Sequence, residues 1–371
     1  MKSFDIIVIG GGIAGASVAA HLAETKRVAI LEMEERAGYH TTGRSAASYE
    51  PNYGPPPMLA FTRASDHFFR EPPKGFADAE LLTQRDSLFL MPEGQEDHAE
   101  ALLSLGAGLA EISVRAAQES FPVLRSDYAR RVFLDPNTGD LDVDLIHRGY
   151  LKLFKARGGT LLVAHQVRGL LHRGGIWQLA TDHGIFASPI VVNAAGAWGD
   201  VIAKLGGVKP MGLVPKRRSV GIIAMDGVED FMDWPVVSDV AETWYCKPQS
   251  GKLIVSSADA TPVEPHDAYA DDLAIAEGVE RLMTATTLEV GRMGHSWGGL
   301  RTFAPDGNPV VGYDPTTEGF FWLAGQGGYG IQSAPALSET AAALIFDKQL
   351  PASVVGHGLD LSQITPRRFQ K

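Results

Sequence analysis

Three glycines near the start of the chain restrict its fold more than any other feature of the sequence. Gly10, Gly12 and Gly15 follow an apolar run at residues 4–9 and precede a helical pattern that continues to about Glu24. The first glycine permits a tight turn, the second lets a pyrophosphate approach the backbone, and the third lets the helix pack closely on the strand. The pattern therefore predicts a strand–turn–helix unit that binds a dinucleotide.

The helix after this turn and the strand that follows it complete the predicted unit. Ile13 and Ala14 begin the helix, so unpaired N–H groups and the positive end of the helix dipole face the phosphates. The next strand, at residues 27–31, leads to Glu32, where a carboxylate would bind a ribose hydroxyl. That carboxylate would repel a 2′-phosphate, which disfavours NADP. A glycine-rich turn without a ligand is the alternative interpretation.

A second glycine pattern lies near the end of the chain. Gly325, Gly327 and Gly330 follow an apolar strand at residues 320–324 and precede a long helix. Asp347 has about the right spacing for a ribose-binding acid, but the residues before it form a continuous helical pattern. We therefore interpret this segment as a helix N-terminus directed at an anionic group, such as a reduced flavin. A plain helix start is the alternative.

The arrangement of these units predicts an α/β fold with two domains. Strand–glycine–helix units occupy both ends, and β-rich material lies between them, so the ends are expected to join in one Rossmann-like nucleotide-binding domain. Insertions then form a second, mixed or antiparallel-sheet domain for the substrate. The predicted nucleotide-binding domain comprises residues 1–85, 145–215 and 295–371, and the predicted substrate-binding domain comprises residues 86–144 and 216–294.

Composition excludes several classes of protein. Hydrophobic residues make up 45% and charged residues 21% of the 371 residues, as in globular proteins. The net charge of −11 provides no general attraction for nucleic acid or an anionic membrane. The uncharged stretch at residues 6–20 is too short and too rich in glycine for a membrane anchor. No small-residue cleavage site follows this stretch, so we expect a cytoplasmic protein. Cys246 is the single cysteine, so an intramolecular disulfide is excluded, and the histidines form no metal-binding motif, so we expect no metal site.

Four segments together resemble the flavin-dependent amine and D-amino-acid oxidoreductases, which include glycine oxidase, sarcosine oxidase and D-amino-acid oxidase. The segments are Gly10–Gly15 with Glu32, residues 37–45, residues 192–198, and residues 299–307 followed by Gly325–Gly330. The resemblance implies that the cofactor is FAD. Relatives with covalent flavin use a cysteine in the segment that corresponds to Thr302–Gly307, and this segment has none, so we expect non-covalent FAD.

Several stretches look like those of bacterial D-arginine dehydrogenases, a branch of this family. The stretches are TTGRSAA (41–47), PKRRS (215–219), GFFW (319–322) and QGGYGIQ (326–332). This resemblance implies further contacts with the pyrophosphate, the adenine half and the flavin ring of FAD. The implied residues are Gly43, Arg44, Ser45, Val167, Ala195, Gly196, Gly327, Gly328, Tyr329, Gly330 and Ile331.

Arginines are the predicted anchors for a substrate carboxylate. Arg301 matches the carboxylate-binding arginine of the family, and a planar guanidinium can hold a carboxylate at two points. Arg218 is the second candidate, although its neighbour Arg217 could be the residue that points inward. The resemblance further implies that Tyr245 bonds the substrate, that Tyr53 belongs to a lid, and that the Gly328 carbonyl lies near the substrate amine.

Two positions depart from the D-arginine dehydrogenase pattern. Ser48 replaces a histidine near the substrate, and Ser87 replaces the glutamate that pairs with a substrate guanidinium. Asp86 is adjacent to Ser87, but neighbouring residues of a strand face opposite ways. A buried guanidinium without a carboxylate partner is costly. The sequence therefore predicts a preference for neutral over basic side chains.

These residues predict oxidative deamination of a D-amino acid or a related secondary amine to a 2-oxo acid, by hydride transfer from Cα to flavin N5. A 2-hydroxy-acid dehydrogenase, an oxygen-using glycine or sarcosine oxidase and a non-catalytic FAD-binding protein are the alternatives. The electron acceptor, either oxygen or a quinone or dye, is left open by the sequence.

Overall fold

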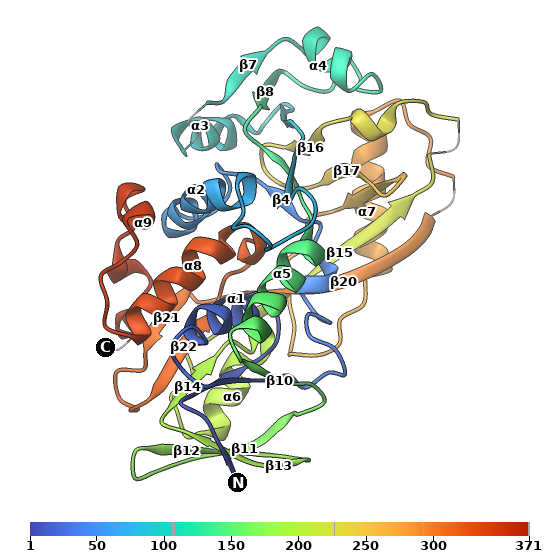
Figure 1. The fold of residues 1–371 in the computed structure, drawn as a ribbon. Coiled ribbons are helices and arrows are strands. Elements are labelled where there is room, and N and C mark those ends of the chain that lie inside the picture. Colours follow the sequence, from blue (N-terminus) through green and yellow to red (C-terminus); the bar gives the residue numbers. More distant parts are fainter. Residues whose placement is uncertain (106–107, 226, 292, 370–371) are drawn as a thin grey trace.

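A six-stranded sheet joins segments from both ends of the chain (Figure 1). The structure, a computed structural model, describes residues 1–105, 108–225, 227–291 and 293–369. Neighbouring strands of this sheet run parallel, except that β21 is antiparallel to β22. The order across the sheet is β10 (Thr160–Leu162), β3 (Val28–Leu31), β2 (Ile6–Ile9), β14 (Ile190–Asn193), β22 (Phe320–Ala324) and β21 (Val310–Tyr313).

Both faces of this sheet are covered, which explains its continuous apolar strands. Ile6 and Val8 of β2 pack toward a layer of helices, whereas Ile7 and Ile9 pack toward the opposite layer. The helices are α1 (Ile13–Leu22), α2 (Pro56–Arg70), α5 (Val143–Ala156) and α8 (Gly330–Ile345). The opposite layer contains α6 (Gly199–Leu205) and a sheet of β1 (Lys2–Ser3), β13 (Gly184–Ser188), β12 (Ile176–Thr181) and β11 (Val167–Arg173).

A larger sheet forms the second half of the molecule, where β15 and β20 run side by side (Figure 1). Its pairings are antiparallel apart from the parallel pair of β16 and β6. The order is β19 (Thr261–Pro262), β15 (Val214–Ile223), β18 (Lys252–Ser256), β17 (Tyr245–Gln249), β16 (Val236–Asp239), β6 (Ser87–Met91), β8 (Arg131–Asp135) and β7 (Ala110–Ile112), with β20 (Met293–Phe303) also paired to β15.

Smaller elements complete the described chain. A three-stranded sheet contains β4 (Ser48–Tyr49), β9 (Gly139–Leu141) and β5 (Leu82–Gln84). The remaining α-helices are α3 (Glu96–Leu105), α4 (Val114–Ser120), α7 (Asp272–Ala285) and α9 (Ala352–Gly356). Single turns of 3-10 helix lie at Thr42–Arg44, Gly196–Trp198, Phe231–Asp233, Leu361–Gln363 and Pro366–Phe369.

The predicted α/β class, with a Rossmann-like part and a second sheet formed by insertions, is confirmed. The acidic start of residues 142–157 and the glycine pair that follows them predict a helix, and the structure contains it as α5. The Asp142 carboxylate caps this helix by accepting from the Leu145 N–H at 2.9 Å. The Pro-, Gly- and Tyr-rich residues 48–57 predict a structured loop, but helix α2 begins at Pro56 within this segment and was missed. The predicted boundary at residue 295 falls inside β20, which pairs along β15.

Within the described residues, no helix is both long enough and apolar enough to span a membrane.

Candidate active site

The larger of two adjoining cavities lies at the carboxyl ends of the parallel strands. It has a volume of about 430 Å³, and its lining includes Ile9, Leu31, Ala194 and Gly325, at or just beyond the ends of β2, β3, β14 and β22. In open α/β sheets, ligands bind outside this edge. The cavity therefore lies where the sequence predicts a dinucleotide.

The glycine turn between β2 and α1 leaves no space for side chains. A Cβ at Gly10 would lie 2.5 Å from the Ala194 carbonyl oxygen, and a Cβ at Gly15 would lie 1.9 Å from the Gly10 carbonyl oxygen. Gly12 is the N-cap of α1 and offers no capping side chain, while the Ile13 N–H donates to the Thr42 hydroxyl at 3.0 Å. The helix N-terminus thus opens onto the cavity with backbone groups alone, a cradle suited to a pyrophosphate.

Glu32 forms the predicted acidic end of β3 and is 6% exposed. One carboxylate oxygen accepts from the Gly11 N–H at 2.6 Å and the other from the Glu34 N–H at 2.9 Å. These bonds fix the carboxylate in the wall of the larger cavity. A carboxylate held in this way can still accept hydrogen bonds from ribose hydroxyls.

Most residues predicted to contact the cofactor line the larger cavity. They are Gly10, Gly12, Ile13, Ala14, Glu32, Arg44, Ser45, Val167, Ala195, Gly196, Gly327, Gly328, Gly330 and Ile331. Three others are absent from its lining. Gly15 packs on Gly10, Gly43 lines a neighbouring groove, and the ring of Tyr329 packs edge-on against Tyr53 with centroids 4.9 Å apart. Contacts of these three residues with the cofactor stay predictions.

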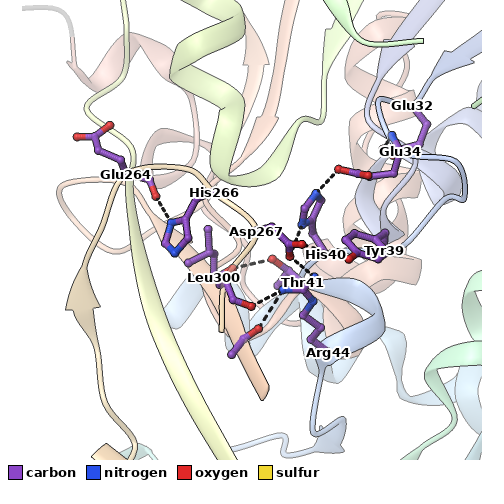
Figure 2. Close-up of polar contacts among 12 residues, drawn as sticks. Glu32, Glu34, Tyr39, His40, Thr41, Arg44, Glu264, His266, Asp267 and Leu300 are labelled. Carbon is purple, nitrogen blue, oxygen red and sulfur yellow. Dashed lines mark hydrogen bonds and ion pairs between the residues drawn. The ribbon is translucent and has the colours of Figure 1, made fainter. Parts of the chain in front are cut away.

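A segment from the second half of the molecule contacts residues that line this cavity (Figure 2). The Arg44 guanidinium pairs with Asp267 and donates to the Ala268 carbonyl at 2.6 Å. The Tyr39 hydroxyl donates to the other Asp267 oxygen at 3.1 Å, and His40 bonds Glu34 at 2.9 Å. The hydrogen bond from Arg44 holds the pKa of Asp267 below its usual value. Arg44 therefore supports the wall of the cavity as well as lining it.

The smaller cavity, of about 100 Å³, adjoins the larger one and is lined by every residue that the sequence analysis predicted for the substrate. These residues are Ser48, Tyr53, Ser87, Arg218, Tyr245, Arg301 and Gly328. Arg218, Tyr245, Arg301 and Gly328 also line the larger cavity, so the two cavities meet at this point. A group bound in one cavity therefore faces a molecule bound in the other.

Arg301 has the geometry expected of a carboxylate anchor. It extends from β20, and its guanidinium donates to the Tyr53 hydroxyl at 3.3 Å. A Cβ on Gly328 would lie 2.8 Å from the Arg301 guanidinium carbon, so only glycine leaves room for this side chain. The buried Tyr245 hydroxyl has no protein partner among the described residues and is free to bond a ligand.

The two predicted arginines have different environments. The Arg218 Nε donates to the Asp259 carbonyl oxygen at 2.9 Å, whereas Arg217 pairs with Asp271 at 2.6 Å. Arg218 lines both cavities, so it is the arginine that points inward. Burial, together with the charge of Arg301, lowers the pKa of Arg218. The guanidinium stays charged at neutral pH because its normal pKa is so high.

The sequence analysis missed two carboxylates in the smaller cavity, Glu50 and Glu242. Burial raises the pKa of Glu50 to about 7, and the nearby Glu242 charge adds to this effect. Burial also raises the pKa of Glu242, although a hydrogen bond from the Tyr53 hydroxyl opposes the shift. Glu50 could have been found from the sequence, because residues 48 and 50 of an extended segment point the same way.

These carboxylates bear on one step of the sequence analysis. The absence of an acid at Ser87 was taken to leave a basic substrate side chain without a partner. Ser87 and Glu50 line the same cavity, so an acid from another element lies in it. The preference for neutral side chains stays a prediction, and Glu50 is an argument against it.

The fold and the two joined cavities define a flavin-type oxidoreductase, with a dinucleotide cradle next to an arginine-anchored pocket. The family model described as FAD-dependent oxidoreductase (DAO) matches residues 5–344, so the chain belongs to that family and FAD is its cofactor. Among the described residues, Cys246 is a fully buried core residue that lines neither of the two cavities. We propose that FAD is held without a covalent bond.

Comparisons with individual proteins agree with this family. Glycine oxidase of Bacillus licheniformis is 27% identical over 361 residues, and the match covers 93% of each chain. Human mitochondrial sarcosine dehydrogenase is 26% identical over 342 residues, which cover 85% of this chain but 37% of that protein. The crystal structure of L-proline dehydrogenase from P. horikoshii superposes with a TM-score of 0.84 at 22% identity, covering 100% of this chain and 98% of that one.

Proposed function

We propose that the protein oxidises the Cα–N bond of a D-amino acid, or of a related secondary amine, to an imino acid. Water then hydrolyses the imino acid to a 2-oxo acid and releases the amine nitrogen. The observation that carries the proposal is the position of Arg301, where the smaller cavity meets the cofactor cavity. A carboxylate held by this guanidinium brings its own Cα to the boundary between the two cavities.

The residues around Arg301 have complementary tasks in this reaction. Arg301 and Arg218 bind the substrate carboxylate, and the free Tyr245 hydroxyl donates a further hydrogen bond. Tyr53 closes over the cavity and excludes water, because its hydroxyl bonds Arg301 and its ring packs on Tyr329. FAD, when bound, supplies the acceptor for the hydride. The protein supplies orientation and electrostatics.

The relatives support an amine substrate without fixing its stereochemistry. Their names refer to glycine, sarcosine and L-proline. Glycine and sarcosine have no α-carbon stereocentre. Preference for the D-form is therefore a part of the proposal that rests on the likeness to D-arginine dehydrogenases in the stretches 41–47 and 326–332.

Anaerobic reduction of the purified flavoprotein tests the proposal. The panel contains D- and L-amino acids, glycine, sarcosine, both prolines and 2-hydroxy acids. We expect D-amino acids to bleach the flavin absorbance and to yield 2-oxo acids. Bleaching by L-forms alone would contradict the stereochemical part, and bleaching by none of the amines would contradict the whole proposal. Admission of oxygen, or of a quinone, to the reduced protein then identifies the electron acceptor.

A 2-hydroxy-acid substrate is the second candidate function. Its oxidation needs a base to remove the hydroxyl proton, and Glu50, with its pKa raised by burial to about 7, is a carboxylate that could act as one. The hydroxy acids in the same panel distinguish this candidate, since they alone would then bleach the flavin.

A further inference from the structure

Of the two described acids that line the smaller cavity, Glu242 accepts a hydrogen bond from Tyr53, whereas no described side chain bonds the carboxylate of Glu50. Within the described residues, no hydrogen bond or ion pair joins this carboxylate to the protein, although four charged groups act on it. They are Glu242, Lys247, Asp135 and Arg301. Two of these are acidic, and they raise the cost of ionising Glu50.

The two cations near Glu50 already have other partners. Lys247 forms an ion pair with an Asp140 carboxylate oxygen and donates a hydrogen bond to the Ala46 carbonyl, both at 2.7 Å. Arg301 bonds the Tyr53 hydroxyl at 3.3 Å and is the proposed anchor of the substrate carboxylate. The second acid of the cavity, Glu242, accepts a hydrogen bond from Tyr53. A positive group that pairs with Glu50 must therefore come from a ligand.

The arginines of the smaller cavity and its serines lie on different strands of the larger sheet. Arg301 and Arg218 extend from β20 and β15, whereas Ser87 and Ser238 lie on β6 and β16, beyond β18 and β17 in the strand order. Ser87 is paired in register with Asp135, one of the charges that act on Glu50. A substrate whose carboxylate binds the arginines therefore extends its side chain toward Ser87 and Glu50.

Unpartnered polar groups mark the same end of the cavity. The Ser87 hydroxyl and the Gln332 side-chain N–H group are buried, with residues 2% and 3% exposed, and neither has a partner among the described residues. The Gln332 oxygen accepts from the Glu50 N–H at 2.9 Å, which fixes Glu50 next to it. Buried polar groups normally find partners. The unsatisfied hydroxyl of Ser87 and N–H group of Gln332 therefore indicate that a polar group of the ligand binds at this position.

We propose that Glu50 determines substrate specificity by pairing with a positive charge on the substrate side chain. The substrate class is then an amino acid with an amino or guanidino side chain, which replaces the preference for neutral side chains expected from Ser87 alone. The inference rests on the proposed function. The bond that is oxidised stays the same as in the proposed function, because the charge that Glu50 recognises lies on the side chain, away from Cα.

The test compares substrates that differ only in this charge. D-lysine is paired with D-norleucine, and D-arginine with D-citrulline, in anaerobic flavin reduction by the wild type and by Glu50→Gln. We expect the wild type to favour the charged member by roughly 10- to 100-fold, as for a charge-assisted contact. Glu50→Gln should abolish this ratio, so that the charged and uncharged members of each pair react at equal rates. Glu93→Gln, at an exposed glutamate paired with Arg130, is the matched control.

Each outcome separates the inference from the proposed function. Equal rates with D-lysine and D-norleucine would overturn the role of Glu50 while the proposed function stands, as would an unchanged ratio in Glu50→Gln. If only the L-forms react and the charged members are favoured, the inference holds and the proposed stereochemistry fails. If no amino acid reduces the flavin, both fail. If Glu50→Gln loses activity with both members of a pair, its flavin absorbance is compared with that of the wild type to check that FAD is bound. Glu50→Asp, which keeps the negative charge, should then restore the preference for the charged member.

Discussion

At the scale of single residues, Arg301 is the side chain on which the proposed reaction most depends. Arg301→Lys keeps the positive charge but loses the planar fork that binds a carboxylate at two points. One charge-assisted hydrogen bond contributes about 1.5–3 kcal/mol, so we expect kcat/KM to fall roughly 10- to 100-fold. Stopped-flow flavin reduction measures the change, and the flavin spectrum checks that the cofactor is retained.

The control for this variant is Arg130→Lys, an exposed arginine paired with Glu93. Exposed ion pairs contribute little, so its kcat/KM should equal that of the wild type. Equal losses of kcat/KM in both variants, or an unchanged kcat/KM in Arg301→Lys, would contradict the proposal that Arg301 binds the substrate carboxylate.

Glu50 also makes stability depend on pH. Its folded-state pKa is raised from 4.5 to about 7, so the folded protein keeps a proton that the unfolded chain has lost in this range. The free energy of unfolding therefore falls as pH rises from about 4.5 to 7. Glu50→Gln removes this penalty. We expect the variant to be more stable than the wild type by about 1–3 kcal/mol at pH 8, and equally stable at pH 4.5.

Urea unfolding of the holoenzyme at both pH values measures this difference. The groups that face Glu50 are Glu242, Lys247, Asp135 and Arg301, and their own titration is common to both proteins. If Glu50→Gln is no more stable than the wild type at pH 8, then positive groups of the protein already stabilise the ionised Glu50 carboxylate. The same ionisation predicts that the preference for D-lysine over D-norleucine increases as pH rises through about 7.

At the scale of elements, the contact between β2 and α1 fixes the cofactor cradle. Gly15 lies where a Cβ would meet the Gly10 carbonyl oxygen at 1.9 Å. Because this neighbour is backbone, Gly15→Ala must displace the helix from the strand. We expect a loss of about 1–3 kcal/mol in stability and weaker FAD binding. The ratio of flavin to protein absorbance after dialysis, together with the thermal midpoint, measures both effects.

Gly356→Ala is the matched control for the glycine turn. Gly356 lies in α9, and a Cβ there would meet no atom within 4 Å. This variant should keep its flavin and be at least as stable as the wild type, because alanine favours helix. Full retention of FAD by Gly15→Ala would show that the helix can move without opening the cradle.

At the scale of the whole molecule, the sequence predicted the parts that depend on local signals. The glycine turn, the capped helix α5 and the two end units required only neighbouring residues, and the structure contains them. The family resemblance selected Arg301 and six further residues of the smaller cavity. Glu50 was missed, although it lies two residues from Ser48, because the residues near it are remote in sequence. They are Gln332 of α8, which bonds the Glu50 N–H, and Ser87 of β6, which lines the same cavity. Helix α2 was missed because the preceding Pro-rich segment was interpreted as a loop.

The two halves of the molecule also meet at a contact that no local pattern predicts. Asp267, in the segment after β19, pairs with Arg44 beside the cofactor cavity and accepts from the Tyr39 hydroxyl (Figure 2). The Asp267 side chain is 59% exposed, so the pair is partly screened by solvent and contributes at most about 1 kcal/mol. Asp267→Asn should therefore loosen Arg44 and speed the dissociation of FAD by about two- to fivefold.

The rise in flavin fluorescence after large dilution of the holoenzyme measures the rate of FAD dissociation. The pKa of Asp267 is held below its usual value, so the stabilising pair is fully present above the ordinary pKa of an aspartate. The pair is lost as pH falls through the lowered pKa of the folded protein. The wild type should then approach the variant at low pH and at high salt, where the pair is weakened. Glu93→Gln, at an exposed ion pair with Arg130 that lines neither cavity, is the control. Equal rates in the wild type and in Asp267→Asn at neutral pH would show that the two halves hold the cofactor without this contact.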